Sequence, residues 1–109
     1  MNYQTHTSTI AENLAEIYPE FENEWGFGPC GAYSALKREE GWGDVAVCTA
    51  HTADDDMGFS HYVIISDGII DMSNPLDEEL TYTNIEILNA DEMPDLVDAE
   101  VIDWLRERL

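Results

Sequence analysis

Three residue types that serve nucleophilic catalysis occur in this chain in the order Cys30, His61 and Asp71. A cysteine nucleophile needs a base within hydrogen-bond reach and a third group that orients the base. His61 lies inside an apolar run, where an unpaired imidazole is costly and a partner is expected. Attack of an activated thiol on a carbonyl carbon is the chemistry that such a set would perform.

Cys30 is placed where a turn leads into a helix. Gly28-Pro29 interrupts the preceding structure, and the fixed φ of proline suits a first helical turn. Residues 30–40 have helical spacing of apolar side chains, and Gly41 ends the helix. The sulfur is therefore expected at the helix N-terminus, where free backbone N–H groups favour a thiolate and can hold an oxyanion. The simpler interpretation is that Cys30 is a small buried apolar residue.

The third member of the set depends on how a predicted hairpin is paired. Two runs rich in β-branched residues, 59–66 and 69–73, are separated by Asp67-Gly68, which is a strong turn signal. Apolar residues fall on both faces of these runs, so we expect the pair to lie centrally in a sheet. Because side chains alternate between the faces of a strand, a shift of one residue decides which side chain reaches His61.

Two turns are compatible with this hairpin. A two-residue turn places Asn74 opposite His61 and directs Asp71 to the other face. A three-residue loop with a bulge at Gly68 places Asp71 on the face of His61, one diagonal step away. A carboxylate stabilises an imidazolium better than an amide does, which favours Asp71 and keeps Asn74 as the alternative.

The remaining segments predict the elements that position these residues. Thr9 and Glu12 form a capping box for a short helix that Pro19 ends. Further expected elements are strands over residues 44–52 and 81–88 and a closing helix over residues 95–107. We therefore expect one α+β domain over residues 1–109, with N-terminal helices packed on an antiparallel sheet of about four strands and a C-terminal helix.

The net charge is the most unusual feature of the composition. The chain has 24 Asp and Glu against four Lys and Arg, a formal net charge of −20. This balance excludes a general phosphate-binding surface and predicts no direct binding of nucleic acid. Three explanations remain: a solvating acidic surface, imitation of a nucleic-acid backbone, or selection of a basic partner or substrate. The first is the simplest, since the acids are spread over both ends and the loops.

The sequence also predicts a compartment and the absence of bound groups. It contains no run of about 18 apolar residues and no basic-then-apolar N-terminal pattern, which predicts a cytoplasmic protein without membrane spans and leaves delivery as an effector open. Cys30 and Cys48 are then expected to be free thiols. The three adjacent aspartates, 54–56, lack the spacing of a calcium loop, so neither a metal nor an organic cofactor is expected.

Two blocks of this sequence resemble the papain-like and transglutaminase-like cysteine hydrolases, in particular small bacterial and phage members. The first block contains Gly28, Cys30, Ser34 and Leu36, and the second runs from His61 to Asp71 as HYVIISDGIID. The resemblance covers residues 28–75 and implies a papain-like core, in which a helix with the nucleophile packs on a sheet that carries the histidine and aspartate. Papain has a glutamine shortly before its cysteine for the oxyanion hole, and residues 22–27 of this chain contain none.

The expected function is cysteine-dependent hydrolysis or acyl transfer at an amide (peptide or isopeptide) or ester bond. Cys30 attacks the carbonyl, His61 activates the thiol and later protonates the leaving group, and Asp71 or Asn74 orients the imidazole. The expected substrate is a peptide or protein, with basic character as one option; the oligomeric state stays open. The alternative is a non-catalytic, highly acidic binding protein that imitates nucleic acid or inhibits a basic partner.

Overall fold

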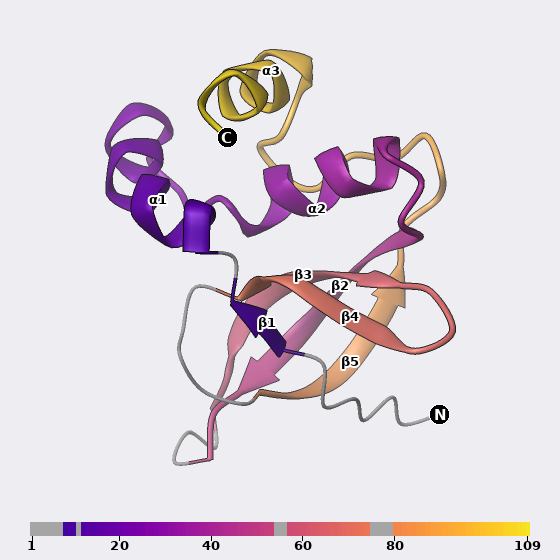
Figure 1. The fold of residues 1–109 in the computed structure, drawn as a ribbon. Helices are drawn as coiled ribbons and strands as arrows, with labels where there is room; N and C mark the ends of the chain where they lie inside the picture. The colour runs from indigo at the N-terminus through magenta and orange to yellow at the C-terminus, as the bar shows by residue number, and fades with distance from the viewer. Residues whose placement is uncertain (1–7, 11, 54–56, 75–79) are drawn as a thin grey trace.

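The computed structural model describes residues 8–10, 12–53, 57–74 and 80–109 (Figure 1). Within them it has three helices and five strands. In chain order these are β1 (Ser8–Ile10), α1 (Glu12–Trp25), α2 (Cys30–Glu39), β2 (Asp44–His51), β3 (Phe59–Ile65), β4 (Ile69–Asn74), β5 (Thr81–Ile87) and α3 (Ala99–Arg108).

The strands form one sheet in the order β1-β4-β3-β2-β5. Strands β2 to β5 are antiparallel to their neighbours, whereas β1 pairs with β4 in parallel. The α+β class and the four-stranded antiparallel sheet are thus confirmed, with β1 as an addition at one edge. The two runs of the hairpin, β3 and β4, lie inside the sheet, as the apolar character of both faces predicted.

The helices form a layer on one side of the sheet, with α2 between α3 and the strands (Figure 1). Apolar residues of all three helices meet in one core that contains no strand residue. Its aromatic part is built from edge-to-face contacts of Phe21 with Phe27 and with Trp104. Ring pairs of this kind add to the stability that burial alone gives, which holds α1 and α3 against each other.

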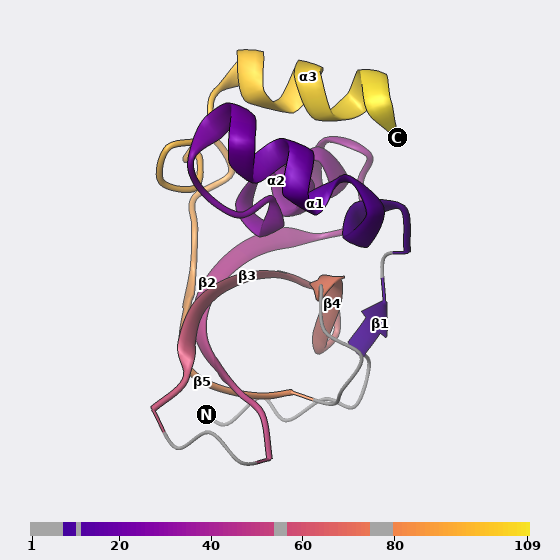
Figure 2. The ribbon, with the colours of Figure 1, turned by 90° about the vertical axis from the view of Figure 1, so that its left-hand side faces the viewer.

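A second core lies inside the sheet, which curls strongly on itself (Figure 2). Its residues come from the concave faces of β2 to β5 and from the segment before β5: Ala46, Cys48, Ala50, Val63, Ile69, Leu80 and Tyr82. The curl brings β5, at one edge of the sheet, back toward β4, from which β3 and β2 separate it in the strand order. Polar side chains that point into this curl are therefore removed from water.

The N-terminal prediction was wrong in two respects. Thr9 lies in strand β1 and caps no helix, and α1 continues through Pro19 to Trp25. A proline inside a helix costs about 3 kcal/mol because it removes a hydrogen bond and crowds the preceding turn. The apolar stripe of α1 continues beyond the proline to the fully buried Phe21, and burial of that ring offsets much of the cost.

The closing helix begins later than its apolar spacing predicted. Asp98 is the N-cap of α3, and its side chain accepts a hydrogen bond of 3.0 Å from the Val101 backbone N–H. Leu96 has a φ of 67°, in the left-handed region, so the chain cannot be helical there. The helix therefore starts at Ala99, after an aspartate cap.

Among the described helices, none has the length and apolar character needed to cross a membrane.

Candidate active site

The hairpin adopts the three-residue loop. Ile65 pairs with Ile69, and the Ser66 N–H donates a 2.9 Å hydrogen bond to the Gly68 carbonyl across the loop. Both Asp67 (φ 63°) and Gly68 (φ 129°) have positive φ. Aspartate tolerates the left-handed region better than most residues, which makes this loop accessible to the sequence. Of the two predicted pairings of the hairpin, the structure therefore has the one with a bulge at Gly68.

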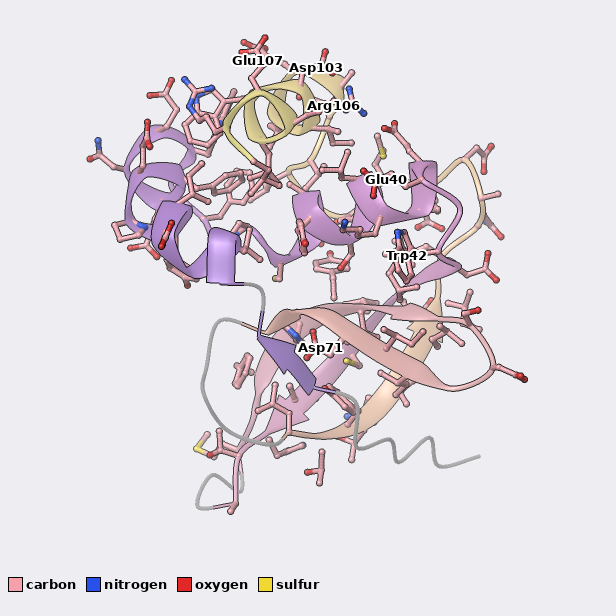
Figure 3. The ribbon with its side chains drawn as sticks, viewed as in Figure 1. Glu40, Trp42, Asp71, Asp103, Arg106 and Glu107 are labelled. Carbon is pink, nitrogen blue, oxygen red and sulfur yellow. The ribbon has the colours of Figure 1, made fainter. Side chains whose placement is uncertain are left out.

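This register brings His61 and Asp71 together on the concave face of the sheet. The His61 Nε2 and the Asp71 Oδ2 lie 2.8 Å apart, and the two residues are 1% and 0% exposed. Figure 3 shows Asp71 inside the curl. The same Oδ2 accepts a 2.8 Å hydrogen bond from the Tyr82 hydroxyl. Two donors from different strands therefore hold one carboxylate, with its orientation fixed by both.

Asn74, the alternative orienting residue, is the last residue of β4 and pairs with Ile10 of β1. Its side chain lies outside the described part of the structure. The imidazole nitrogen that an orienting group would contact is occupied by Asp71. The geometry therefore gives the aspartate, of the two candidates, the place next to the imidazole.

Cys30 is the first residue of α2. The residue before it, Pro29, has no N–H, and no side chain in the described ranges caps this end of the helix. The first backbone N–H groups of a helix have no partner within the helix and carry its positive dipole end. The sulfur thus lies where the sequence predicted it, beside free N–H donors.

Cys30 and His61 line one cavity of about 190 Å³. Its wall is made by the end of the turn before α2, by the start of β3 and by one side chain of α1: Tyr18, Gly28, Pro29, Cys30, Phe59, Ser60 and His61. The ring of Phe59 contacts the imidazole edge-to-face, with centroids 5.7 Å apart. The thiol and the imidazole therefore border one space that is large enough for a small acyl group.

The protonation of His61 follows from its surroundings. Burial alone would lower its pKa, since it disfavours the cation, but this influence is outweighed. Side-chain hydrogen bonds to Asp71 and Cys30, and the negative charge of both groups, together raise the pKa of His61 to about 9. The imidazole is thus protonated at neutral pH. Because Nε2 is bound to Asp71, Nδ1 is the nitrogen left for the Cys30 sulfur.

Cys48 is the second thiol, and it differs from Cys30 in its burial and in its place in the fold. It pairs with His61 across β2 and β3, is 4% exposed, and lies 3.6 Å from the His61 carbonyl oxygen as a weak donor. Burial, and then the charges of Asp71 and Cys30, raise the pKa of Cys48 to about 12. It is therefore a protonated core residue at neutral pH, as predicted. Both cysteines are free.

Gly31 lets the helix approach the sheet closely enough to join the two halves of the site. A Cβ at this position would lie 3.0 Å from the Pro94 Cβ and 3.2 Å from the Tyr62 ring. The hydroxyl of Tyr62 in turn accepts a 3.1 Å hydrogen bond from the Asp95 N–H. The segment before α3 thus locks β3 against the first turn of α2, which sets the position of Cys30 relative to His61.

Two tyrosines near the site were not predicted as functional residues. Tyr82 was predicted to be a core residue, which is correct, but its hydroxyl contact with Asp71 depends on the curl of the sheet. Tyr18 was not singled out at all, because the helix that carries it was expected to stop at Pro19. A buried hydroxyl needs a partner, so a tyrosine on an inward-facing strand position was the available signal for Tyr82.

In the described ranges, no group of three or more His, Cys, Asp or Glu is gathered as metal ligands would be. Comparison with protein-family models, curated proteins and solved structures gives no match to this chain.

Proposed function

We propose that this protein is a cysteine-dependent hydrolase or acyltransferase that acts on an amide or ester bond. The observation that carries the proposal is the buried 2.8 Å pair of His61 and Asp71, whose imidazole shares one cavity with Cys30 at the start of a helix. A nucleophile, a base and a group that orients the base are the three parts that this chemistry requires. Asp71 takes the third role in preference to Asn74.

In the proposed reaction the Cys30 thiolate attacks the carbonyl carbon while His61 is protonated. The carbonyl π electrons move to oxygen, which the N–H groups at the start of α2 stabilise. Collapse of this intermediate breaks the bond to the leaving group, and His61 supplies the proton that the leaving group needs. Attack of water or an amine on the resulting thioester, with His61 as the base, releases the acyl group.

We further propose that α2 and the curled sheet form a papain-like core. Two features support this proposal: the helix starts with the nucleophile, and its first turn packs on the strand that carries the histidine through Gly31 and Tyr62. The orienting carboxylate comes from the next strand in the sheet. These features support the proposal, because the resemblance of the two sequence blocks implies a helix with the nucleophile packed on a sheet that carries the histidine and the aspartate.

The charge distribution favours a basic peptide or protein as substrate. All four Lys and Arg lie on α2 and α3, and each contacts carboxylates or carbonyls of the chain itself. Figure 3 shows one of them, Arg106, near Asp103 on α3. At the cavity, by contrast, the charge of Glu22 acts on the lining residue Tyr18, and the charges of Asp95, Cys30 and Glu92 act on Tyr62, which follows the lining residue His61. Cations are thus attracted toward the thiol.

The two free thiols fit a reducing compartment such as the cytoplasm.

Acyl transfer from p-nitrophenyl acetate tests the proposal without knowledge of the natural substrate. We expect a burst of p-nitrophenolate and one acetyl group on Cys30, located by mass spectrometry after digestion. Cys30→Ala should abolish the burst, whereas Cys48→Ala, which removes the other thiol, should retain it.

A burst that survives Cys30→Ala would refute the assignment of the nucleophile. Absence of acetylation in the folded native protein would refute the enzymatic function as a whole. The non-catalytic alternative, an acidic protein that binds a basic partner, predicts this second result and has no requirement for Cys30.

A further inference from the structure

Tyr18 lines the same cavity as Cys30 and His61. Its side chain comes from α1, one residue before Pro19, and Gly28, in the turn before α2, is a further lining residue. A Cβ on Gly28 would lie 3.2 Å from the Tyr18 hydroxyl oxygen. The hydroxyl is therefore in contact with the turn that leads into α2, two residues before the nucleophile.

The Tyr18 hydroxyl is an available donor. It has no hydrogen-bond partner among the residues that the structure describes, although the ring is half-buried. Burial, the charge of Glu22 and the charge of Cys30 all raise the pKa of Tyr18, so the phenol stays protonated wherever the thiol is ionised near neutral pH. A phenolic O–H held beside a nucleophile, with no internal acceptor, is suited to an acceptor that arrives with a substrate.

We propose that Tyr18 is a catalytic residue that donates a hydrogen bond to the oxyanion formed when Cys30 attacks a carbonyl. This inference rests on the proposed function. As the C–S bond forms, the C=O π pair becomes a lone pair on oxygen, and the new negative charge is shared between the backbone N–H groups at the start of α2 and the Tyr18 O–H. When the C=O bond is restored the leaving group departs with its electron pair, and the tyrosine keeps its proton throughout.

The donor comes from the preceding helix and reaches the same end of α2 across Gly28. A side chain on Gly28 would meet the hydroxyl at a distance tighter than ordinary van der Waals contact. The glycine thus leaves room for the phenol at the turn.

Two reagents that react with the Cys30 thiol distinguish stabilisation of an oxyanion by Tyr18 from an effect of Tyr18 on the reactivity of the thiol itself. Acetylation by p-nitrophenyl acetate passes through an oxyanion, whereas alkylation by iodoacetamide displaces iodide from carbon and forms none. We expect Tyr18→Phe to slow acetylation of Cys30 by about tenfold or more, since loss of one oxyanion donor costs on the order of 10²–10³ in a full enzymatic turnover and less with an activated ester. Alkylation should change by less than about twofold, because the thiol and its imidazole are untouched.

Tyr33→Phe is the matched control, because Tyr33 lies on α2 but does not line the cavity; both of its rates should equal those of the native protein. The ratio of the two rates in one sample does not depend on how much protein is folded, so a loss of stability cannot imitate the effect. Equal acetylation in Tyr18→Phe and native protein, or an equal slowing of both reactions, would overturn the inference and leave the proposed function standing. Failure of the native protein to acetylate Cys30 would overturn both.

Discussion

The imidazole Nε2 of His61 lies 2.8 Å from the Oδ2 of Asp71, and both residues are removed from solvent inside the curl of the sheet. A carboxylate in this position favours the charged form of the imidazole and fixes the direction in which its other nitrogen points. The pair thus decides both when the site is protonated and where the proton is held.

Asp71→Asn tests the charge of this pair with little change of shape. The amide retains an acceptor for Tyr82 but removes the negative charge, so the pKa of His61 should fall well below about 9. With less imidazolium at neutral pH, we expect alkylation of Cys30 at pH 7 to slow by about tenfold. Asn74→Ala, at the end of the same strand, should leave the rate within about twofold of native. If Asn74→Ala slowed alkylation more than Asp71→Asn does, Asn74 and not Asp71 would be the residue that orients His61.

The pKa of His61 also predicts how folding stability depends on pH. Because it is about 9 in the folded protein and near 6.5 ordinarily, the folded state binds this proton more tightly than the unfolded chain does. The resulting stabilisation is complete below about pH 6.5 and is lost as the pH rises through about 9. The melting temperature, followed by circular dichroism, should fall across this range and fall less in Asp71→Asn. Parallel curves for the two proteins would contradict the raised pKa.

The two thiols should react at very different rates. Cys30 is partly exposed, whereas Cys48 is buried and has a pKa of about 12, which leaves almost no thiolate at neutral pH. Brief treatment with limiting iodoacetamide at pH 7, followed by mass spectrometry, should place the label on Cys30. Cys48→Ala should be labelled like the native protein and Cys30→Ala hardly at all. Equal labelling of both cysteines would show that Cys30 has no special environment.

Tyr82→Phe removes the second donor to Asp71 and keeps the ring that packs in the sheet core. The carboxylate charge is then shared with fewer donors, so the pKa of His61 should rise above its native value by a few tenths or more. A hydrogen bond to a charged group contributes on the order of 1.5–3 kcal/mol, and the free energy of unfolding in urea should decrease by about that amount. Titration of the imidazole by NMR separates the two effects. An unchanged pKa would mean that Tyr82 serves packing alone.

The acidic surface predicts a response to salt. With a net charge of −20, and with the four basic residues confined to α2 and α3, repulsion among carboxylates opposes folding at low ionic strength. The melting temperature should therefore rise between low and moderate NaCl. A constant melting temperature would show that the carboxylates are already neutralised by bound cations or by a basic partner, as the non-catalytic alternative expects.

Local patterns in the sequence were sufficient for strands β2 to β5 and for the place of Cys30, but not for β1. The Asp67-Gly68 turn, the alternation in β2 and the Gly28-Pro29 break each depend on neighbouring residues, and each element lies close to its predicted range. The register was narrowed to two alternatives but not decided, because Gly68 can take positive φ in both. Positive φ at Asp67 does not decide the register either, because Asp-Gly is also the typical pair of a two-residue turn in which both residues have positive φ.

Features that depend on tertiary packing were not predictable in the same way. Pro19 predicted the end of α1, yet the helix continues to Trp25 with Phe21 fully buried, and Tyr18, one residue before the proline, lines the cavity. The contact of Tyr82 with Asp71 joins strands that are not neighbours in the sheet, so no pattern along either strand contains it. Tyr18 and Tyr82, which were not predicted as functional residues, are the two that these features bring to the site.

The line of hydrogen bonds from His61 through Asp71 to Tyr82 spans the inside of the curled sheet, from β3 and β4 to β5. It therefore acts as a cross-link between one edge strand and the middle of the sheet. Residues proposed for the chemistry are, by this geometry, also responsible for closing the curl. Tolerance to substitution should consequently be lowest inside the curl, and a loss of reactivity there cannot be separated from a loss of rigidity unless the replacement preserves both hydrogen bonds.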